Sequence, residues 1–344
     1  MDLREKIMLL SRESGPAGFE KNAVDKAAEL LDPCVDELQT DVMGNLLALR
    51  RCGKPGAPVI MLDAHIDEVG LIVTGYENGS FRFSELGGID ARVLPATEVK
   101  LLTPEGPIRG VVDFLPPHVV PAPEREKPLA MDKLFIDAGF TTDEEAQKHV
   151  PLGTSAVFAT DCFALGENQI AGKSLDDRSC AAILIEVMER LKEKTLAVDL
   201  TVLLSAQEEV GCRGAQVGAF AVKPEQAIAV DVTFGRSPEE SAHKTVKMNG
   251  GAAITVGPAA SRQVSDKLIT LSREKKLPYQ LEVMGGCSGT DADDIQVSGE
   301  GVAMGVVSLP LKYMHTPVEV IDLRDAETIV ELLAAWVLSF GEED

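Results

Sequence analysis

The chain has 344 residues, more than an ordinary single domain, which predicts two domains or one domain with a sizeable insertion. Hydrophobic residues make up 45% of it and charged residues 26%, a balance typical of a folded globular protein. The net charge of -22 would repel nucleic acid and anionic membrane surfaces, so neither is expected as a partner.

The six cysteines form no Cys-x-x-Cys pair, which indicates reduced thiols rather than a structural zinc site or a disulfide framework. The N-terminus alternates charged with apolar side chains and lacks the continuous hydrophobic segment of a secretory signal. No stretch approaches the roughly 20 apolar residues of a membrane helix. We therefore expect a cytoplasmic protein.

The N-terminal part predicts two helices followed by two strands. Helical periodicity covers residues 2–12 and 20–32, and a segment rich in Gly and Pro separates them. Residues 45–50 and 58–64 are apolar and suited to burial inside a mixed sheet. The chain is therefore expected to begin as an α/β domain.

The sequence pattern changes from alternating helices and strands to short strands between residues 70 and 163. Short strand-like runs over 70–75, 98–103 and 108–112 are broken by Gly and Pro, which predicts a small β domain. After Leu175 the α/β pattern returns, with helices expected at 179–194, 261–276 and 325–340, and strands at 200–205, 227–232, 279–283 and 301–307.

The fold class predicted from this order is α/β, with a mixed central sheet flanked by helices. Residues 1–69 and 164–344 would form one domain, and residues 70–163 a β-rich, barrel-like insertion in it.

Five polar residues stand where a predicted strand gives way to a loop, a distribution typical of a two-metal hydrolase. They are His65, Asp176, Glu209, Asp231 and His315. Each follows an apolar or small-residue run, and the carboxyl ends of strands in open α/β sheets are where ligands gather. Asp231 and His315 are weak evidence when each is taken alone. The other histidines, His118, His149 and His243, are assigned to surface or insertion roles.

His65 and Asp67 belong to the segment AHID at the end of a predicted strand. Residues two apart in an extended chain project from the same face, so Asp67 is placed to orient the imidazole. A carboxylate on the far ring nitrogen is the usual support of a metal-bound histidine. The alternative is a structural histidine with no ligand.

Asp176 and Asp177, in the segment LDDR, precede a helix expected from Ser179. Either carboxylate could cap that helix, and either could lie between two cations about 3.5 to 4 Å apart. The spacing does not decide which of them bridges. Arg178 is expected to anchor the neighbouring acid.

Glu208 and Glu209 follow the apolar strand LTVLLS in the segment QEEVG. Neighbours on extended backbone point to opposite sides, so one is expected to bind metal and the other to face the substrate water. Two buried like charges raise one pKa, which suits a general base. The alternative is a solvated acidic turn.

Taken with these motifs, the sequence resembles the M42 family of metallo-aminopeptidases, the tetrahedral and glutamyl aminopeptidase-like members of the co-catalytic zinc exopeptidase clan. The resemblance covers essentially the whole chain. The matching segments are 64–73, 87–90, 116–118, 175–178, 205–215, 229–233, 288–292 and 313–320.

The resemblance implies a zinc-exopeptidase-like fold and two divalent metal ions per subunit, zinc before cobalt or manganese. His65 and Asp231 would bind one ion, Glu209 and His315 the other, and Asp176 would bridge them. In addition, Glu208 would be the catalytic base and Asp67 the support of His65.

The resemblance also implies hydrolysis of the N-terminal peptide bond of short peptides, and a homo-oligomer of dimers that extends to a tetrahedral dodecamer. The insertion would serve dimerisation and substrate binding. The loops at 250–258 and 285–290 are expected to form walls of the specificity pocket. The identity of the N-terminal residue removed is not predicted.

Two other functions were weighed. A glycoside hydrolase using Glu208 and Glu209 is disfavoured, because a retaining pair faces each other about 5 to 5.5 Å apart and sequence neighbours diverge. The two histidines would also have no role. A non-catalytic peptide-binding protein would require a lost ligand or base, yet all seven candidate positions are filled.

Overall fold

A computed structural model describes residues 1–116, 118–120, 129–238, 241 and 243–341. Pro117, in the matching segment 116–118, lies outside the described residues. The larger of two sheets has eleven strands, in the order β1-β2-β12-β3-β13-β16-β17-β11-β10, with β14 paired to β16 and β15 to β14. The strands of this sheet are β1 Glu37–Thr40, β2 Leu46–Arg50, β3 Val59–His65, β10 Phe163–Leu165, β11 Gln169–Gly172, β12 Asp199–Ser205, β13 Gln226–Phe234, β14 Ala252–Val256, β15 Tyr279–Val283, β16 Ala303–Lys312 and β17 Glu319–Asp322.

The centre of this sheet is parallel. β12, β3, β13 and β16 run in one direction, and the outer pairs such as β1 with β2 and β11 with β17 are antiparallel. The sheet is therefore mixed, and its four central strands end at the same edge.

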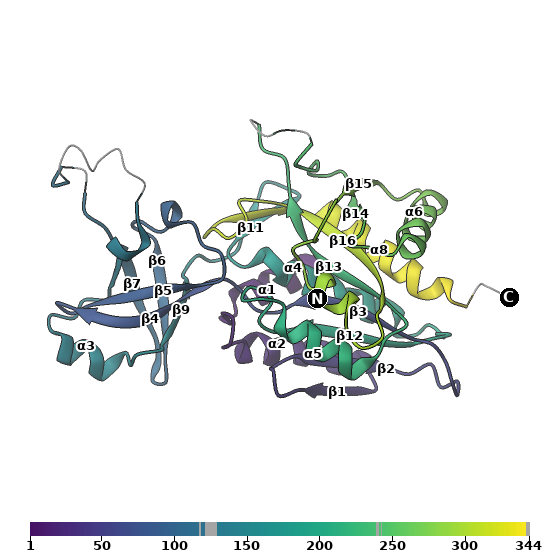
Figure 1. Ribbon diagram of the computed structural model, residues 1–344, viewed down its shortest axis with the longest axis horizontal. Coiled ribbons are helices and arrows are strands. Elements are labelled where there is room, and N and C mark those ends of the chain that lie inside the picture. Colours follow the sequence, from purple (N-terminus) through teal and green to yellow (C-terminus); the bar gives the residue numbers. More distant parts are fainter. Residues whose placement is uncertain (117, 121–128, 239–240, 242, 342–344) are drawn as a thin grey trace.

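Helices cover both faces of the sheet. They are α1 Leu3–Arg12, α2 Lys21–Leu31, α4 Leu175–Leu191, α5 Arg213–Val222, α6 Arg262–Lys275, α7 Ala292–Gln296 and α8 Leu323–Ser339. Ile60 and Leu62 of β3 pack in the core shared with α1, α2, α4, α6 and α8, whereas Met61 packs with α5 and α7. This alternation follows from the two-residue period of a strand, and it gives the layers seen in Figure 1.

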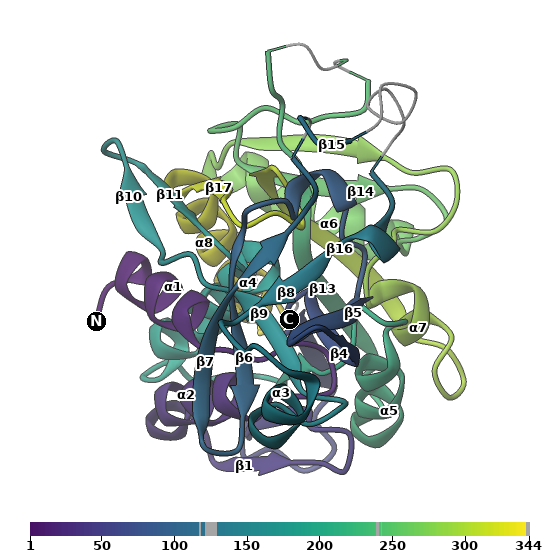
Figure 2. The ribbon, with the colours of Figure 1, turned by 90° about the vertical axis from the view of Figure 1, so that its left-hand side faces the viewer.

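The second sheet is a closed barrel with the order β4-β5-β8-β7-β6-β9 and a hydrophobic core of its own. Its elements are β4 Gly70–Glu77, β5 Ser80–Leu86, β6 Glu98–Thr103, β7 Gly106–Asp113, β8 Phe135–Asp137, α3 Asp143–His149 and β9 Ser155–Phe158. The barrel projects from one end of the helix-flanked sheet (Figure 1) and faces the viewer in Figure 2. The predicted fold class, a mixed sheet flanked by helices with an inserted β-rich part, is confirmed.

Several elements differ from their predicted bounds. The strand predicted at 301–307 continues as β16 to Lys312, through Pro310. Helix α3 was not predicted, because it is short and buries only Ala146, although Thr142 caps its first turn. The three- and four-residue strands β1, β8, β9, β10, β11 and β17 were not predicted either, because such short runs carry no periodic signal.

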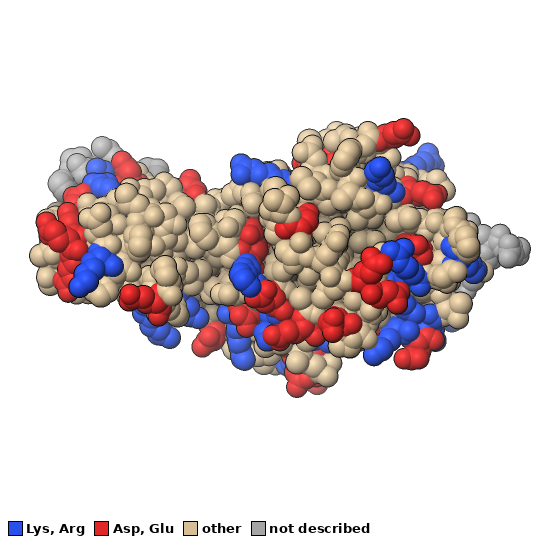
Figure 3. Space-filling model, turned by 90° about the horizontal axis from the view of Figure 1, so that it is seen from below, with Lys and Arg blue, Asp and Glu red and all other residues tan. Residues whose placement is uncertain are grey.

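On the face shown in Figure 3, acidic and basic side chains lie interspersed rather than in a field of one sign. Among the described residues, no helix combines the length and the apolar character needed to cross a membrane.

Candidate active site

The parallel centre of the large sheet brings the predicted site residues to one edge. His65 is the last residue of β3, and it lies in register with Ser205 at the end of β12, after which Glu208 and Glu209 follow. Asp231 lies in β13, and His315 follows β16. Six of the site residues line one cavity of about 420 Å³, namely His65, Asp176, Glu208, Glu209, Asp231 and His315. Residues up to 250 positions apart therefore share one pocket, because parallel strands end together.

Asp176 lies between the two histidines. Its Oδ1 is 3.0 Å from His65 Nε2, and its Oδ2 is 3.3 Å from His315 Nε2. His315 Nε2 is also 3.2 Å from Glu209 Oε1. Burial acts to raise the pKa of Asp176, but its bonds to His315 and His65 outweigh burial and hold the pKa below its usual value. Each oxygen thus faces a different half of the site.

His315 is held from both sides of its ring. Its Nδ1 lies 2.7 Å from the carbonyl oxygen of Gly88, which leaves Nε2 facing the carboxylates. Burial acts to lower the pKa of His315, but Asp176 and Glu209 raise it to about 11. The ring is therefore oriented by a segment that follows the barrel strand β5.

Asp231 and Asp177 complete the half of the site around His65. These three residues offer ligand atoms that all lie within 4.8 Å of one another. Asp177 is fully buried, and neither of its oxygens has a hydrogen-bond partner by geometry among the described residues. From the sequence, Asp177 was open to two roles, as a helix cap or as a metal ligand. Because its carboxylate is buried and lacks donors, Asp177 belongs with the candidate site.

This donor set fits divalent cations. Carboxylate oxygens and imidazole nitrogens converge on the cavity, and both buried carboxylate oxygens of Asp177 lack hydrogen-bond partners by geometry in the described chain. Oxygen and nitrogen ligands of this kind suit zinc, cobalt and manganese. A bound cation would supply the compensating charge that the protein itself does not provide.

Asp67 is fully buried behind the pocket. Its Oδ1 accepts a hydrogen bond from the amide of Glu208 at 3.0 Å, and its Oδ2 accepts one from the amide of Glu209 at 3.2 Å. Its Oδ1 also lies 3.4 Å from His65 Nδ1, a contact outside hydrogen-bond geometry. Asp67 therefore ties the glutamate turn to the strand end that carries His65.

Glu208 faces the cavity. Burial raises its pKa to about 9, with Asp231 and Asp291 adding to the rise and His65 opposing it. One of its oxygens lies 4.0 Å from His65 Nε2.

Glu319 is a site residue that sequence reasoning missed. It is buried at the start of β17, where its Oε2 accepts from the amide of Asp176 at 3.1 Å and its Oε1 from the amide of His315 at 2.8 Å. The available signal was a lone glutamate at the head of the apolar strand EVID. That sequence pattern does not reveal that Glu319 accepts hydrogen bonds from two backbone amides of the site.

The expectation that Arg178 anchors the neighbouring aspartate is wrong. Arg178 donates to the carbonyl oxygens of Ile66 and Leu10, and its nearest carboxylate is Glu68 at 3.8 Å. Glu68 pairs with Lys173 at 2.7 Å, and all three charged side chains are buried. The arginine therefore ties α4 to the loop that leaves β3, rather than holding a metal ligand.

Of the two loops predicted to form walls of the pocket, one lines the cavity and the other does not. Ser288, Gly289 and Thr290 of the expected wall at 285–290 line the cavity, but residues 250–258 do not. His118, His149 and His243 are exposed, and His149 stacks on Phe140 of the barrel. The structure places these three histidines outside the cavity.

The chain is similar to known peptidases in both sequence and structure. The family described as M42 glutamyl aminopeptidase matches residues 44–332. The lysyl aminopeptidase of Pyrococcus furiosus is 33% identical, over 97% of this chain and 95% of its own.

Two solved structures are also similar. An aminopeptidase from Desulfurococcus kamchatkensis has a TM-score of 0.91 at 34% identity, covering 98% of this chain and 94% of that one. The TET1 peptidase of Pyrococcus horikoshii, described as able to assemble into a tetrahedron or a large octahedral shell, has a TM-score of 0.86 at 30% identity, covering 98% and 99%.

The fold and the site define a peptidase of the metal-dependent α/β type. The chain belongs to the M42 peptidase family.

Proposed function

We propose that this protein is a two-metal aminopeptidase that removes the N-terminal residue of short peptides. His65 and Asp231 would hold one divalent cation, Glu209 and His315 the other, with Asp176 between them and zinc as the first choice before cobalt or manganese. The observation that carries this proposal is that the two oxygens of Asp176 face His65 and His315 separately. The aminopeptidase relatives support the reaction.

The bound cations would polarise the scissile carbonyl group and lower the pKa of water from about 15.7 toward about 7. Glu208 would take the proton of the attacking water on a carboxylate oxygen and pass it to the departing amine.

Asp67 is proposed as a positioning residue. Its two accepted hydrogen bonds fix the backbone of Glu208 and Glu209, so that one side chain faces His65 and the other faces His315. This assigns different tasks to two adjacent glutamates, a base and a ligand. Its contact with His65 supports the orientation of that ring.

The contacts of the described site residues argue against a glycosidase. Glu209 lies 3.2 Å from His315 Nε2, so it is engaged with an imidazole and not free to face Glu208 across a sugar. All seven predicted functional positions retain their side chains.

We further propose a homo-oligomeric, cytoplasmic enzyme in which residues 70–163 serve assembly and substrate binding. Val111, Leu115, Val119 and Leu152 of this part are exposed, and large exposed apolar side chains are typical of surfaces that another chain covers. The assembly described for the TET1 peptidase supports the same view. The native mass in solution tests it.

The decisive experiment measures hydrolysis of aminoacyl p-nitroanilides together with the metal content of the purified enzyme. We expect turnover that requires a free α-amine, with two metal ions per chain. An active enzyme with fewer than two ions per chain would contradict the two-metal proposal.

A further inference from the structure

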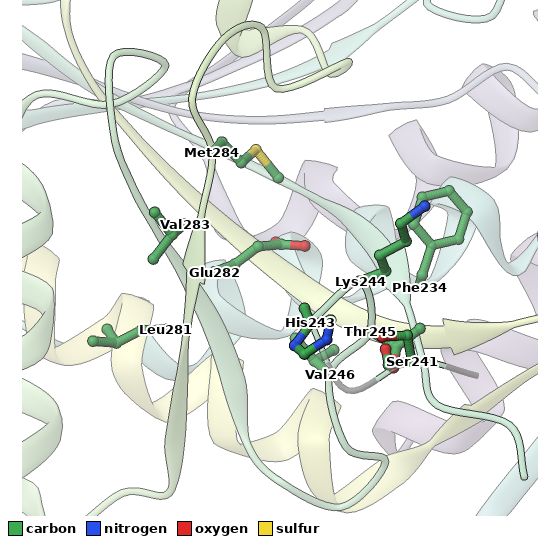
Figure 4. Close-up of a pocket in the computed structure, with 10 residues that line it drawn as sticks. All are labelled: Phe234, Ser241, His243, Lys244, Thr245, Val246, Leu281, Glu282, Val283 and Met284. Atoms are coloured by element: carbon green, nitrogen blue, oxygen red, sulfur yellow. The ribbon is translucent and has the colours of Figure 1, made fainter. Parts of the chain in front are cut away.

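A second cavity adjoins the active-site cavity. It has a volume of about 560 Å³ and is formed by the end of β13, Ser241, residues 243–246 and the strand β15 (Figure 4). The two cavities share Phe234, Glu282 and Met284 in their walls. A substrate whose scissile bond lies at the metal centre can therefore extend past these three side chains.

Glu282 is the charged residue of the shared wall. Among the described residues that line the catalytic cavity, the other charged side chains belong to the proposed centre and the rest are neutral. Leu281 and Val283 line only the second cavity and are exposed, whereas Glu282 between them is half-buried and also lines the catalytic cavity. Figure 4 shows its carboxylate extending away from Leu281 and toward the side of Phe234.

The Glu282 carboxylate has a hydrogen-bond donor for one of its two oxygens. Thr233 donates its hydroxyl to Oε1 at 2.5 Å, whereas Oε2 is buried and has no hydrogen-bond partner within the described part of the chain. Burial raises the pKa of this carboxyl group, with the Thr233 bond opposing the rise. A buried carboxylate oxygen without a donor is costly, and a cation of the substrate would remove that cost.

The position of this oxygen is tied to the proposed metal centre. Thr233 stands two residues after Asp231 on the same strand, so both side chains point to the same face of β13. The neighbouring Phe234 and Met284 are apolar and can pack against a methylene stem. The arrangement suits a long side chain with a positive end.

Lys244 also lines the second cavity, but it donates no hydrogen bond to the buried Oε2 of Glu282. Its side chain is exposed to solvent, and in Figure 4 it lies beside Phe234. A solvated ammonium contributes far less to recognition than a buried carboxylate that lacks a partner. An acidic substrate side chain directed at Lys244 would also meet the charge of Glu282.

We infer that Glu282 is a specificity-determining residue that selects peptides with an N-terminal lysine or arginine. This inference rests on the proposed aminopeptidase function. The carboxylate receives the ammonium or guanidinium group, and the shared apolar wall receives the stem.

The test compares kcat/KM for lysyl, arginyl, norleucyl and glutamyl p-nitroanilides in the metal-loaded enzyme. Norleucine has an unbranched apolar side chain without the charge of lysine. We expect the basic substrates to exceed norleucyl by about 10- to 100-fold, as a charged hydrogen bond to a buried group would give. Glu282→Gln should lose this preference and retain norleucyl hydrolysis, which also reports that the variant is folded.

Lys244→Gln is the matched control, because it removes a charge from the same cavity and should keep the ratio of lysyl to norleucyl activity. Glu282→Lys should turn the preference toward glutamyl substrates. Equal rates on lysyl and norleucyl substrates in the unaltered enzyme would overturn the inference while leaving the aminopeptidase intact. Uniform loss on all substrates in Glu282→Gln would assign Glu282 to the α-amine and also overturn it. Absence of hydrolysis with every substrate would instead overturn the proposed function.

Discussion

Glu319 accepts a hydrogen bond from the backbone amide of Asp176 at 3.1 Å, and the two residues are 143 positions apart. The second oxygen of Glu319 accepts from the amide of His315 at 2.8 Å, and His315 has a left-handed φ of 59°. One buried carboxylate therefore sets the backbone under both the proposed bridging ligand and a terminal ligand.

Glu319→Gln should weaken metal binding without removing any ligand. The amide group keeps one acceptor but turns a donor toward a backbone N–H, so one of the two bonds is lost. Losses of this kind cost about 10- to 100-fold in metal affinity. Titration of the apo-protein with zinc measures the change, and Glu327→Gln, on the exposed side of α8, is the control. Equal affinity in both variants would remove Glu319 from the site.

Glu208→Gln should abolish most turnover and keep the metal. Loss of a general base costs about 10²- to 10⁴-fold in kcat, while the five proposed ligands are untouched. Elemental analysis of the variant should match the parent enzyme. A variant that retains full activity would assign the proton transfer to another group.

Asp231→Asn should lower metal occupancy and activity together, in contrast to Glu208→Gln. Asp231 and His65 share one half of the site, so a neutral amide there weakens the ligand charge on that cation. Treatment with a chelator should inactivate the parent enzyme, and added zinc, cobalt or manganese should restore it. Activity that survives complete metal removal would contradict the proposed mechanism.

Lys173→Met should destabilise the fold strongly, because it leaves the buried Glu68 without its closest cation at 2.7 Å. Breaking a buried ion pair on one side costs about 3 to 5 kcal/mol. The double variant Glu68→Gln with Lys173→Met should recover part of this loss. Urea unfolding of the three proteins supplies the comparison, and a loss below about 1 kcal/mol in the single variant, typical of surface pairs, would mean that the pair is not buried in solution.

Asp325 predicts a pH dependence of stability. It accepts hydrogen bonds from the amides of Asn249 and Gly251, but burial outweighs these bonds and raises its pKa to about 6 from 3.8. The folded state then binds the proton more tightly than the unfolded state, so this contribution to stability falls as pH rises from about 4 to about 6. Above that range it is constant.

Asp325→Asn removes this titration. The unfolding free energy of the parent minus that of the variant should therefore fall as pH rises from about 4 to about 6. Denaturant unfolding at several pH values measures the difference. If the parent-minus-variant difference rises over this interval instead, the direction assigned to the pKa of Asp325 is wrong.

The arrangement of the site was predictable where it follows from strand order. His65, Glu209, Asp231 and His315 each stand at or near the end of an apolar run, and parallel strands bring such ends together. Glu319 and Asp177 were not predictable in this way, because their importance lies in which amides or carboxylates surround them. Glu282 was missed for a similar reason, since nothing in YQLEV reveals that Thr233 would hold its carboxylate. Local patterns identify strand ends, whereas the partners of a buried polar group depend on the complete fold.

The ion pair between Glu68 and Lys173 has a consequence for how the barrel is attached. Glu68 lies just before β4, where the chain enters the barrel, and Lys173 lies just after β11, where it has rejoined the large sheet. The pair closes the base of a long loop and sits between His65 and Asp176 along the chain. Barrels of different length or surface should therefore be interchangeable as modules. The ion pair at the base, and not the barrel, would then keep the spacing of the proposed ligands His65 and Asp176.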